Sequence, residues 1–84
     1  MQSMKILVTG ATGKVGSRLV PHLLREGHQV RILVRNLERA QALVSLGAQP
    51  AVGDLLSPDS LEPAVRGVDA VVHLAAFFRG ASPE

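Results

Sequence analysis

The stretch Val8-Thr9-Gly10-Ala11-Thr12-Gly13-Lys14-Val15-Gly16 decides the fold of this 84-residue chain. The residues just before it, Lys5 to Val8, form a short, largely apolar and β-branched segment that is typical of a buried parallel strand. After the glycines, aliphatic side chains recur at the spacing of a helix, at Val15, Leu19, Leu23 and Leu24. The stretch therefore predicts a glycine-rich turn that leads from a strand into a helix.

Each glycine of this turn has an expected task. Gly10 allows a tight turn, Gly13 lets a pyrophosphate approach the backbone, and Gly16 lets the helix pack close to the strand. The first turn of a helix has unpaired backbone N–H groups, and the helix dipole adds partial positive charge there. The turn is therefore a predicted phosphate-binding site, and the alternative is a structural turn that holds no ligand.

The order G-x-x-G-x-x-G after Thr9 differs from the G-x-G-x-x-G of the usual dinucleotide-binding fold. It resembles the short-chain dehydrogenase/reductase superfamily, and its Thr-Gly-Ala-Thr-Gly form is most similar to the extended (epimerase/dehydratase-like) and atypical (NmrA-like) branches. The resemblance covers essentially the whole chain but only the first half of the family's domain. It implies that residues 1–76 are the N-terminal half of an NAD(P)-binding Rossmann domain and that residues 77–84 are a tail.

Composition narrows the classes of function. The net charge is only +2, the nine basic residues are scattered, and tyrosine and tryptophan are absent, which argues against a nucleic-acid partner. No apolar run approaches the ~20 residues of a membrane span. Without cysteine the chain has neither disulfides nor thiolate metal sites, and it carries no visible secretory signal. We therefore expect a cytoplasmic globular protein with no membrane contact and no metal.

Apolar runs and turn residues divide the chain into alternating strands and helices. We expect strands at 5–9, 29–34, 49–52 and 70–75, and helices at 13–26, 37–46 and from Ser57-Pro58-Asp59 to Gly67. The second helix should bury Ala40, Leu43 and Val44, and Pro63 should make the third begin late or distorted. This alternation predicts an α/β fold, a partial Rossmann-like doubly wound parallel sheet in the order 3-2-1-4.

The exit of the second strand predicts which cofactor is bound. An acidic residue at this point would hold the ribose 2′-hydroxyl of NAD, but this chain has Arg35 followed by neutral Asn36. A guanidinium can pair with a 2′-phosphate through two hydrogen bonds, so NADP is favoured over NAD. Arg39, one helical turn on, could close over the same phosphate or the adenine. The alternative is that both are solvated arginines.

The resemblance implies the other cofactor contacts. Around the glycine turn they are Gly10, Thr12, Gly13, Lys14, Val15 and Gly16, although Lys14 could equally lie in water. Asp54 is expected to accept a hydrogen bond from the adenine amino group, helped by the backbone of Leu55; the alternative is a turn-forming aspartate. Ala75 and Ala76, in a motif that begins at His73, are expected to lie against the nicotinamide-side ribose.

Catalysis in the resembled family depends on a Tyr-x-x-x-Lys pair, which supplies the general acid or base. This chain contains no tyrosine, and His73 is expected to be a satisfied core histidine rather than a catalyst. We therefore expect a half-domain that binds the cofactor without catalysing a reaction, from a parent reductase, epimerase or dehydratase. The alternative is a non-catalytic NmrA-like nucleotide-sensing or interaction module. The uncharged fourth strand should be an open sheet edge, so self-association or pairing with a missing C-terminal half of the protein is expected.

Overall fold

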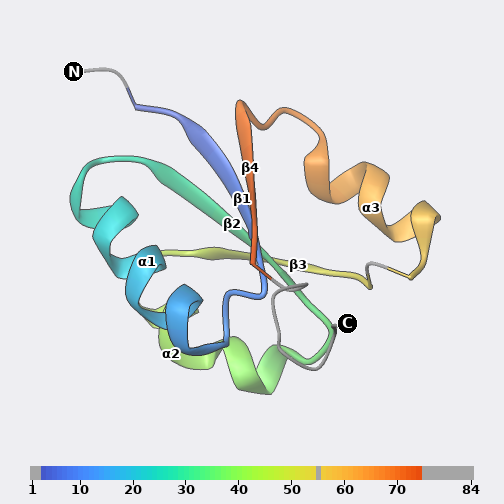
Figure 1. Ribbon diagram of the computed structural model, residues 1–84, viewed down its shortest axis with the longest axis horizontal. Coiled ribbons are helices and arrows are strands. Elements are labelled where there is room, and N and C mark those ends of the chain that lie inside the picture. Colours follow the sequence, from blue (N-terminus) through green and yellow to red (C-terminus); the bar gives the residue numbers. More distant parts are fainter. Residues whose placement is uncertain (1–2, 55, 75–84) are drawn as a thin grey trace, which may run out of the picture.

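A computed structural model describes residues 3–54 and 56–74, which form a four-stranded parallel sheet in the order β3-β2-β1-β4 (Figure 1). Along the chain the elements are β1 Lys5–Thr9, α1 Lys14–Arg25, β2 Gln29–Val34, the 3-10 helix η1 Leu37–Ala40, α2 Gln41–Ser45, β3 Gln49–Val52, α3 Pro58–Val65 and β4 Ala70–His73. The predicted doubly wound α/β order is confirmed, and β1, β2 and β3 have their predicted bounds.

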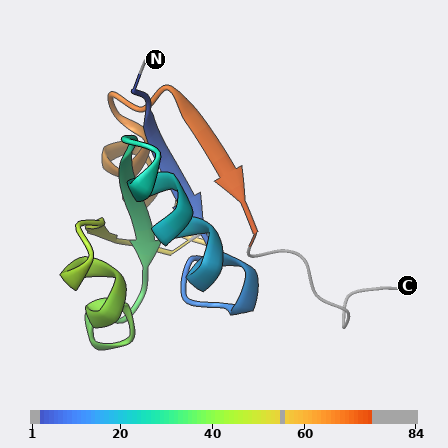
Figure 2. The same cartoon turned by 90° about the vertical axis from the view of Figure 1, so that its left-hand side faces the viewer.

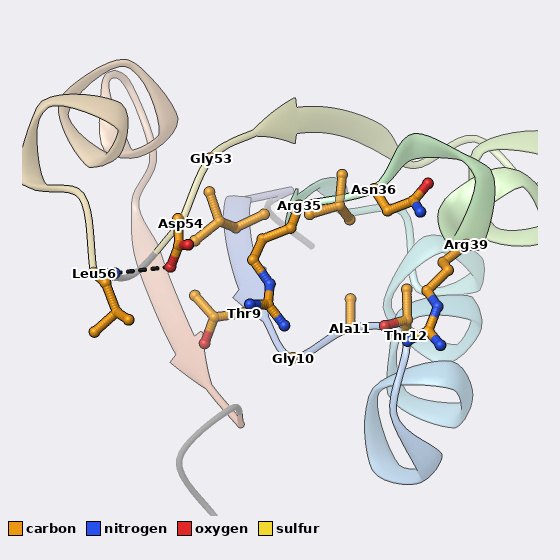
Figure 3. Close-up of a pocket in the computed structure, with 12 residues that line it drawn as sticks. Thr9, Gly10, Ala11, Thr12, Arg35, Asn36, Arg39, Gly53, Asp54 and Leu56 are labelled. Atoms are coloured by element: carbon orange, nitrogen blue, oxygen red, sulfur yellow. Dashed lines mark hydrogen bonds between the residues drawn. The ribbon is translucent and has the colours of Figure 1, made fainter.

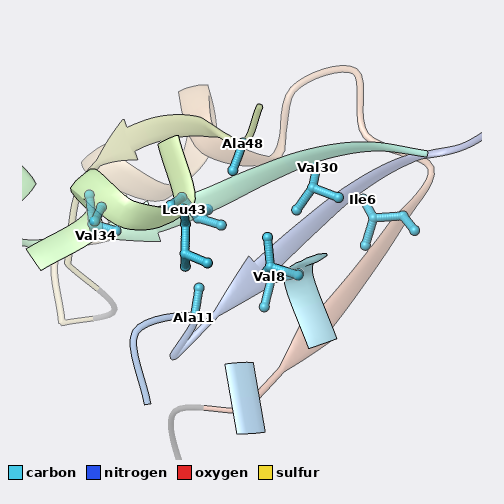
Figure 4. Packing of buried hydrophobic residues seen from close by; sticks show 10 residues of the cluster. Ile6, Val8, Ala11, Val30, Val34, Leu43 and Ala48 are labelled. Atoms are coloured by element: carbon cyan, nitrogen blue, oxygen red, sulfur yellow. The ribbon is translucent and has the colours of Figure 1, made fainter. Parts of the chain in front are cut away.

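Helices cover both faces of the sheet, so the central strand β1 is buried on both sides. On one face Ile6 and Val8 join the larger apolar cluster beneath α1 and α2 (Figure 4). On the other face Leu7 packs with Leu33 and with Ala64 of α3. Figures 1 and 2 show α1 and α2 on one side of the sheet and α3 on the other, which is what right-handed crossovers require. The strand sequence is apolar without alternation because neither face meets water.

The first helix has its predicted bounds to within one residue at each end, but it buries a different face. It runs from Lys14 to Arg25, and Gly13 is its N-cap. Val15, expected at the start of the apolar face, is 63% exposed, whereas Gly16 and Val20 are buried. The buried stripe is shifted by one residue because the glycine, which has no side chain, faces the loop that follows β1.

The second and third helices also correct the prediction. The region expected as one helix over 37–46 begins as η1, capped by the side chain of Asn36, and continues as α2, where Val44 is exposed rather than buried. The third helix begins at Pro58 in its first turn and contains Pro63, so its start is not late. It ends at Val65, before Gly67. A proline removes a single backbone donor, and the remaining bonds of α3 are sufficient to keep it helical.

The fourth strand is shorter than predicted and lies at the edge of the sheet. β4 ends at His73 and pairs with β1. Ala70 and Val72 contact the larger cluster, while Val71, on the opposite face, is 51% exposed. Within residues 3–54 and 56–74 no helix is long and apolar enough to span a membrane.

Candidate functional site

A pocket of about 790 Å³ opens where β1, β2 and β3 end at their carboxyl side (Figure 3). The order 3-2-1-4 reverses direction at β1, and such a reversal leaves a crevice beyond the strand ends. The pocket is lined by the segments that leave each strand: Thr9, Gly10, Ala11, Thr12, Leu33, Val34, Arg35, Asn36, Arg39, Gly53, Asp54 and Leu56. Residues from three distant parts of the chain therefore meet at the edge predicted for ligand binding.

The glycine turn has the tight geometry that the sequence predicted. Gly10 adopts a positive φ of 73°, and the backbone N–H of Gly13 donates to the carbonyl oxygen of Gly10 at 3.1 Å. Gly13 caps α1 without any side-chain hydrogen bond, and the first turn of α1 carries no acidic residue. The N–H groups of that turn have no acceptor within the helix. The loop thus presents a partly positive surface that can hold an anion.

Gly16 is required by packing rather than by backbone conformation. A Cβ atom at this position would lie 2.5 Å from the Cα and carbonyl oxygen of Ala11. These are backbone atoms of the loop that leaves β1, so a side chain has no room unless the helix moves. The expected close approach is confirmed, although the contact is with this loop rather than with the strand itself.

Arg35 and Arg39 are the cationic groups that line the pocket. Both are exposed, and among the described residues neither guanidinium makes a hydrogen bond or an ion pair. In the view of Figure 3 the Arg35 side chain points toward the loop at Gly10, and the Arg39 side chain extends toward Thr12. Asn36, in contrast, makes a hydrogen bond within the protein. Its Oδ1 accepts the N–H of Glu38 at 2.8 Å and caps η1. Two positive charges thus line the pocket, and neither β2 nor the two residues after it carry an acidic side chain.

Asp54 supplies the carboxylate among the residues lining the pocket. Its Oδ1 accepts the backbone N–H of Leu56 at 2.9 Å, as in a turn-forming aspartate (Figure 3). Its own backbone N–H donates to the hydroxyl of Ser60 at 2.9 Å. Both interpretations of Asp54 are therefore compatible with its position, because one carboxylate oxygen shapes the turn while the side chain lines the pocket. Leu55 lies outside the described residues.

Of the other predicted cofactor contacts, some line the pocket, some lie next to it in α1, and some fall outside the described residues. Thr12 lines the pocket, while Gly13, Lys14, Val15 and Gly16 continue from it into the first turn of α1. Lys14 and Val15 are exposed. The predicted contacts Ala75 and Ala76 lie outside the described residues.

His73 corrects one expectation and points to a residue that sequence reasoning missed. Its ring is exposed rather than in the core, and its Nδ1 lies 2.7 Å from the hydroxyl oxygen of buried Thr9. The sequence predicts Thr9 as the last residue of the first strand and the start of the turn, with no site role, yet it lines the pocket and links β1 to β4. A polar residue at the end of an apolar strand was the signal that could have found it. Among the described residues, no group of three or more His, Asp or Glu side chains could hold a metal ion.

Comparison with known proteins agrees with this geometry. Residues 10–83 match a family described as NAD(P)H-binding. The chain is 49% identical over 69 residues to the photosystem II assembly factor Ycf39 of Cyanophora paradoxa, a match that covers 82% of this chain and 22% of that protein.

Solved structures with similar folds include a reductase and a protein solved with NADP+. A triphenylmethane reductase from Citrobacter sp. is 39% identical with a TM-score of 0.73, over 80% of this chain and 24% of that one. AtPrR2, solved with NADP+ and (+)pinoresinol, is 34% identical with a TM-score of 0.76, over 87% of this chain and 26% of that one. The chain thus spans about a quarter of the length of these proteins. It belongs to the NAD(P)H-binding family, with relatives in the extended, epimerase/dehydratase- and NmrA-like branch of short-chain dehydrogenases/reductases.

Proposed function

We propose that this chain binds NADP(H) in the pocket at the ends of β1, β2 and β3. We further propose that it forms the nucleotide-binding part of a reductase, epimerase or dehydratase. The observation that carries the choice of NADP over NAD is the pair of guanidiniums at Arg35 and Arg39, which have no partner among the described residues and lie beside a β2 exit without a carboxylate. A carboxylate there would repel a 2′-phosphate, whereas a guanidinium attracts it. The similarity to AtPrR2, which was solved with NADP+, supports the same choice.

The proposed orientation follows from the charges around the pocket. The pyrophosphate lies against Gly10, Thr12 and the N-terminus of α1, from Gly13 to Gly16, where the backbone N–H groups of Lys14, Val15 and Gly16 have no acceptor within the helix. The 2′-phosphate lies at Arg35, and the adenine lies toward Asp54 and Leu55 on the β3 side. Ala75 and Ala76 are proposed contacts of the nicotinamide-side ribose.

The residues of this chain bind and orient, and the bound cofactor supplies hydride transfer. Because the chain contains no tyrosine, we propose no catalytic residue within it, and we expect no turnover of NADPH with a carbonyl substrate. The reductase relatives favour an oxidoreductase parent over a nucleotide-sensing module. The substrate contacts would then come from elsewhere in a longer protein.

Calorimetric titration of NADP+ and NAD+ into the chain tests the cofactor assignment. We expect NADP+ to bind tighter by roughly ten- to a hundredfold, because a charge-assisted contact contributes about 1.5–3 kcal/mol. Arg35→Ala should remove most of this preference. The matched control is Arg18→Ala, since Arg18 is exposed on α1 and does not line the pocket. Equal affinities in the wild type, or an unchanged preference in Arg35→Ala, would contradict the assignment.

We also propose that the outer edge of β4 is covered in the working protein, either by a second copy or by the C-terminal half of a dinucleotide-binding domain that begins with residues 1–76. Among the described strands β4 pairs with β1 alone, and its residues Ala70–His73 include neither proline nor a formal charge to discourage pairing. Light scattering at several protein concentrations tests whether this chain associates with itself.

A further inference from the structure

Ser60 does not line the pocket, yet its hydroxyl holds the residue that does. Ser60 lies in the first turns of α3, half-buried, with its Oγ 2.9 Å from the backbone nitrogen of Asp54. The same Oγ lies 3.1 Å from the carbonyl oxygen of Asp54 and 2.8 Å from that of Ser57. A hydroxyl has one proton and can also accept. It therefore accepts from the Asp54 N–H and shares its one proton between the two carbonyl oxygens, of which that of Ser57 is nearer. The accepted N–H ties the Asp54 backbone to α3.

Gly53 makes room for this arrangement. A Cβ atom on Gly53 would lie 3.0 Å from the Ser60 Oγ and 2.9 Å from the Cδ1 of Leu33. The Gly53 N–H donates to the carbonyl oxygen of Val34 at 2.9 Å. The corner formed by Gly53 and Asp54 is therefore held to β2 on one side and to α3 on the other. Gly53 has no positive φ, so a side chain here would be opposed by these two neighbouring side chains rather than by backbone strain.

The position of the Asp54 backbone determines where its carboxylate can accept a hydrogen bond from a ligand. Its Oδ1 accepts the N–H of Leu56, while no described residue hydrogen-bonds its Oδ2 (Figure 3). One oxygen thus remains as an acceptor beside the pocket. A hydrogen bond to this oxygen weakens steeply when distance or angle changes, so a small movement of the Asp54 backbone would weaken recognition of a ligand.

We propose that Ser60 is a positioning residue that makes the site selective for a 6-aminopurine over a 6-oxopurine. This inference rests on the proposed function, in which the adenine lies toward Asp54. The amino group of adenine donates to the free carboxylate oxygen. A 6-oxopurine such as hypoxanthine places an acceptor at that point, so two acceptors face each other and the contact is lost. Ser60 acts on this choice only through the position of Asp54.

The experiment compares the affinities of NADP+ and its hypoxanthine analogue, nicotinamide hypoxanthine dinucleotide phosphate, on one protein preparation. We expect the wild type to prefer NADP+ and Ser60→Ala to lower the affinity ratio roughly three- to tenfold, the range that one neutral hydrogen bond supports. Ser57→Ala is the matched control, because it removes a hydroxyl from the same segment that makes no capping hydrogen bond. Its ratio should equal that of the wild type.

The affinity ratio separates positioning from stability, because partial unfolding weakens both ligands equally. If Ser60→Ala does not fold, Ser60→Cys keeps the side-chain shape with a somewhat larger and much weaker hydrogen-bonding group and should lower the ratio in the same direction. A wild type that binds neither dinucleotide overturns the proposed function and this inference together. A wild type that prefers NADP+ with an unchanged ratio in the Ser60 variants overturns the role of Ser60 alone. Equal binding of both dinucleotides by the wild type overturns the selectivity of Asp54 while leaving cofactor binding in place.

Discussion

Alanine substitutions at Gly13 and Gly16 should have opposite consequences, although the two glycines are three residues apart in one turn. At Gly16 a Cβ would lie 2.5 Å from the backbone of Ala11, which is itself 1% exposed. Ordinary carbon contacts need about 3.5–4.0 Å, so helix and loop must separate by roughly 1 Å. At Gly13 the nearest atom to a new Cβ is the carbonyl oxygen of Gly10 at 3.4 Å, and the backbone is extended (φ −78°, ψ −176°). Alanine therefore fits at Gly13 without strain.

The magnitudes follow from these contacts. Overpacking costs about 1–3 kcal/mol, and the contact at Gly16 is with backbone, so we take the upper part of that range. Replacing a helical glycine recovers about 0.5–1 kcal/mol, which leaves a net loss of about 2 kcal/mol. For a chain of this size such a loss lowers Tm by roughly 8–16 °C. At Gly13 alanine is a weaker N-cap, which lowers the free energy of unfolding, but it also reduces the entropy of the unfolded chain, which raises it. The two effects nearly cancel, so the net change in the free energy of unfolding is within about 1 kcal/mol.

Thermal unfolding followed by circular dichroism, together with NADP+ titration, measures both effects. Gly16→Ala should unfold at a clearly lower temperature. Gly13→Ala should keep nearly the wild-type Tm yet bind NADP+ at least tenfold more weakly, because its methyl group occupies the approach of the pyrophosphate. A wild-type melt for Gly16→Ala would refute the close packing of α1 on the loop. Undiminished NADP+ binding by Gly13→Ala would show that phosphate does not sit on this turn.

Two further predictions concern polar contacts made by residues of the sheet. Arg31→Met should lower the free energy of unfolding by about 1–2 kcal/mol, because its guanidinium donates to the Ala64 carbonyl oxygen at 2.7 Å near the end of α3; an unchanged Tm would contradict this. Thr9→Val removes the 2.7 Å contact with His73 and should speed amide exchange at Leu74, whose N–H donates to the carbonyl oxygen of residue 9, while β1–β2 amides stay protected. Uniform exchange throughout the sheet would refute this local role.

The fold was predictable because its determinants are local patterns. Apolar runs of strand length, separated by glycines and helical spacing, specify the order of elements, and the chirality of crossovers then leaves few topologies. The face of α1 could not be obtained this way. Periodicity places Val15 with the other aliphatic residues, but the helix is rotated by the contact of Gly16 with Ala11, which joins two segments that only the tertiary structure brings together. Val44 of α2 is likewise predicted inside and is exposed.

The candidate site was predictable where a residue type is tied to a strand end. Arg35 and Asp54 follow the second and third strands, so parallel pairing brings them to one edge. Contacts that cross between elements left no local signal. Ser60 appears in the sequence as an ordinary helical serine, and its hydrogen bond to the Asp54 backbone depends on the path of the turn between them. His73 is predicted in the core because its strand is apolar, but the edge position of that strand, which the order 3-2-1-4 already predicts, leaves it exposed.

Two arginines of the β2 segment have separate roles, one in stability and one in cofactor binding. Arg31 points toward α3 and donates to carbonyl oxygens at the end of that helix, so its charge is committed to the fold. Arg35, four residues later, lies beyond the strand, lines the pocket and makes no hydrogen bond among the described residues. Arg31→Met should therefore lower Tm and leave the preference for NADP+ over NAD+ unchanged. Arg35→Ala should leave Tm unchanged and reduce the preference for NADP+. Because the two side chains share no partner, the effects should add in the double variant within about 0.5 kcal/mol. A loss of cofactor preference in Arg31→Met would mean that α3 and the pocket are coupled, contrary to this division.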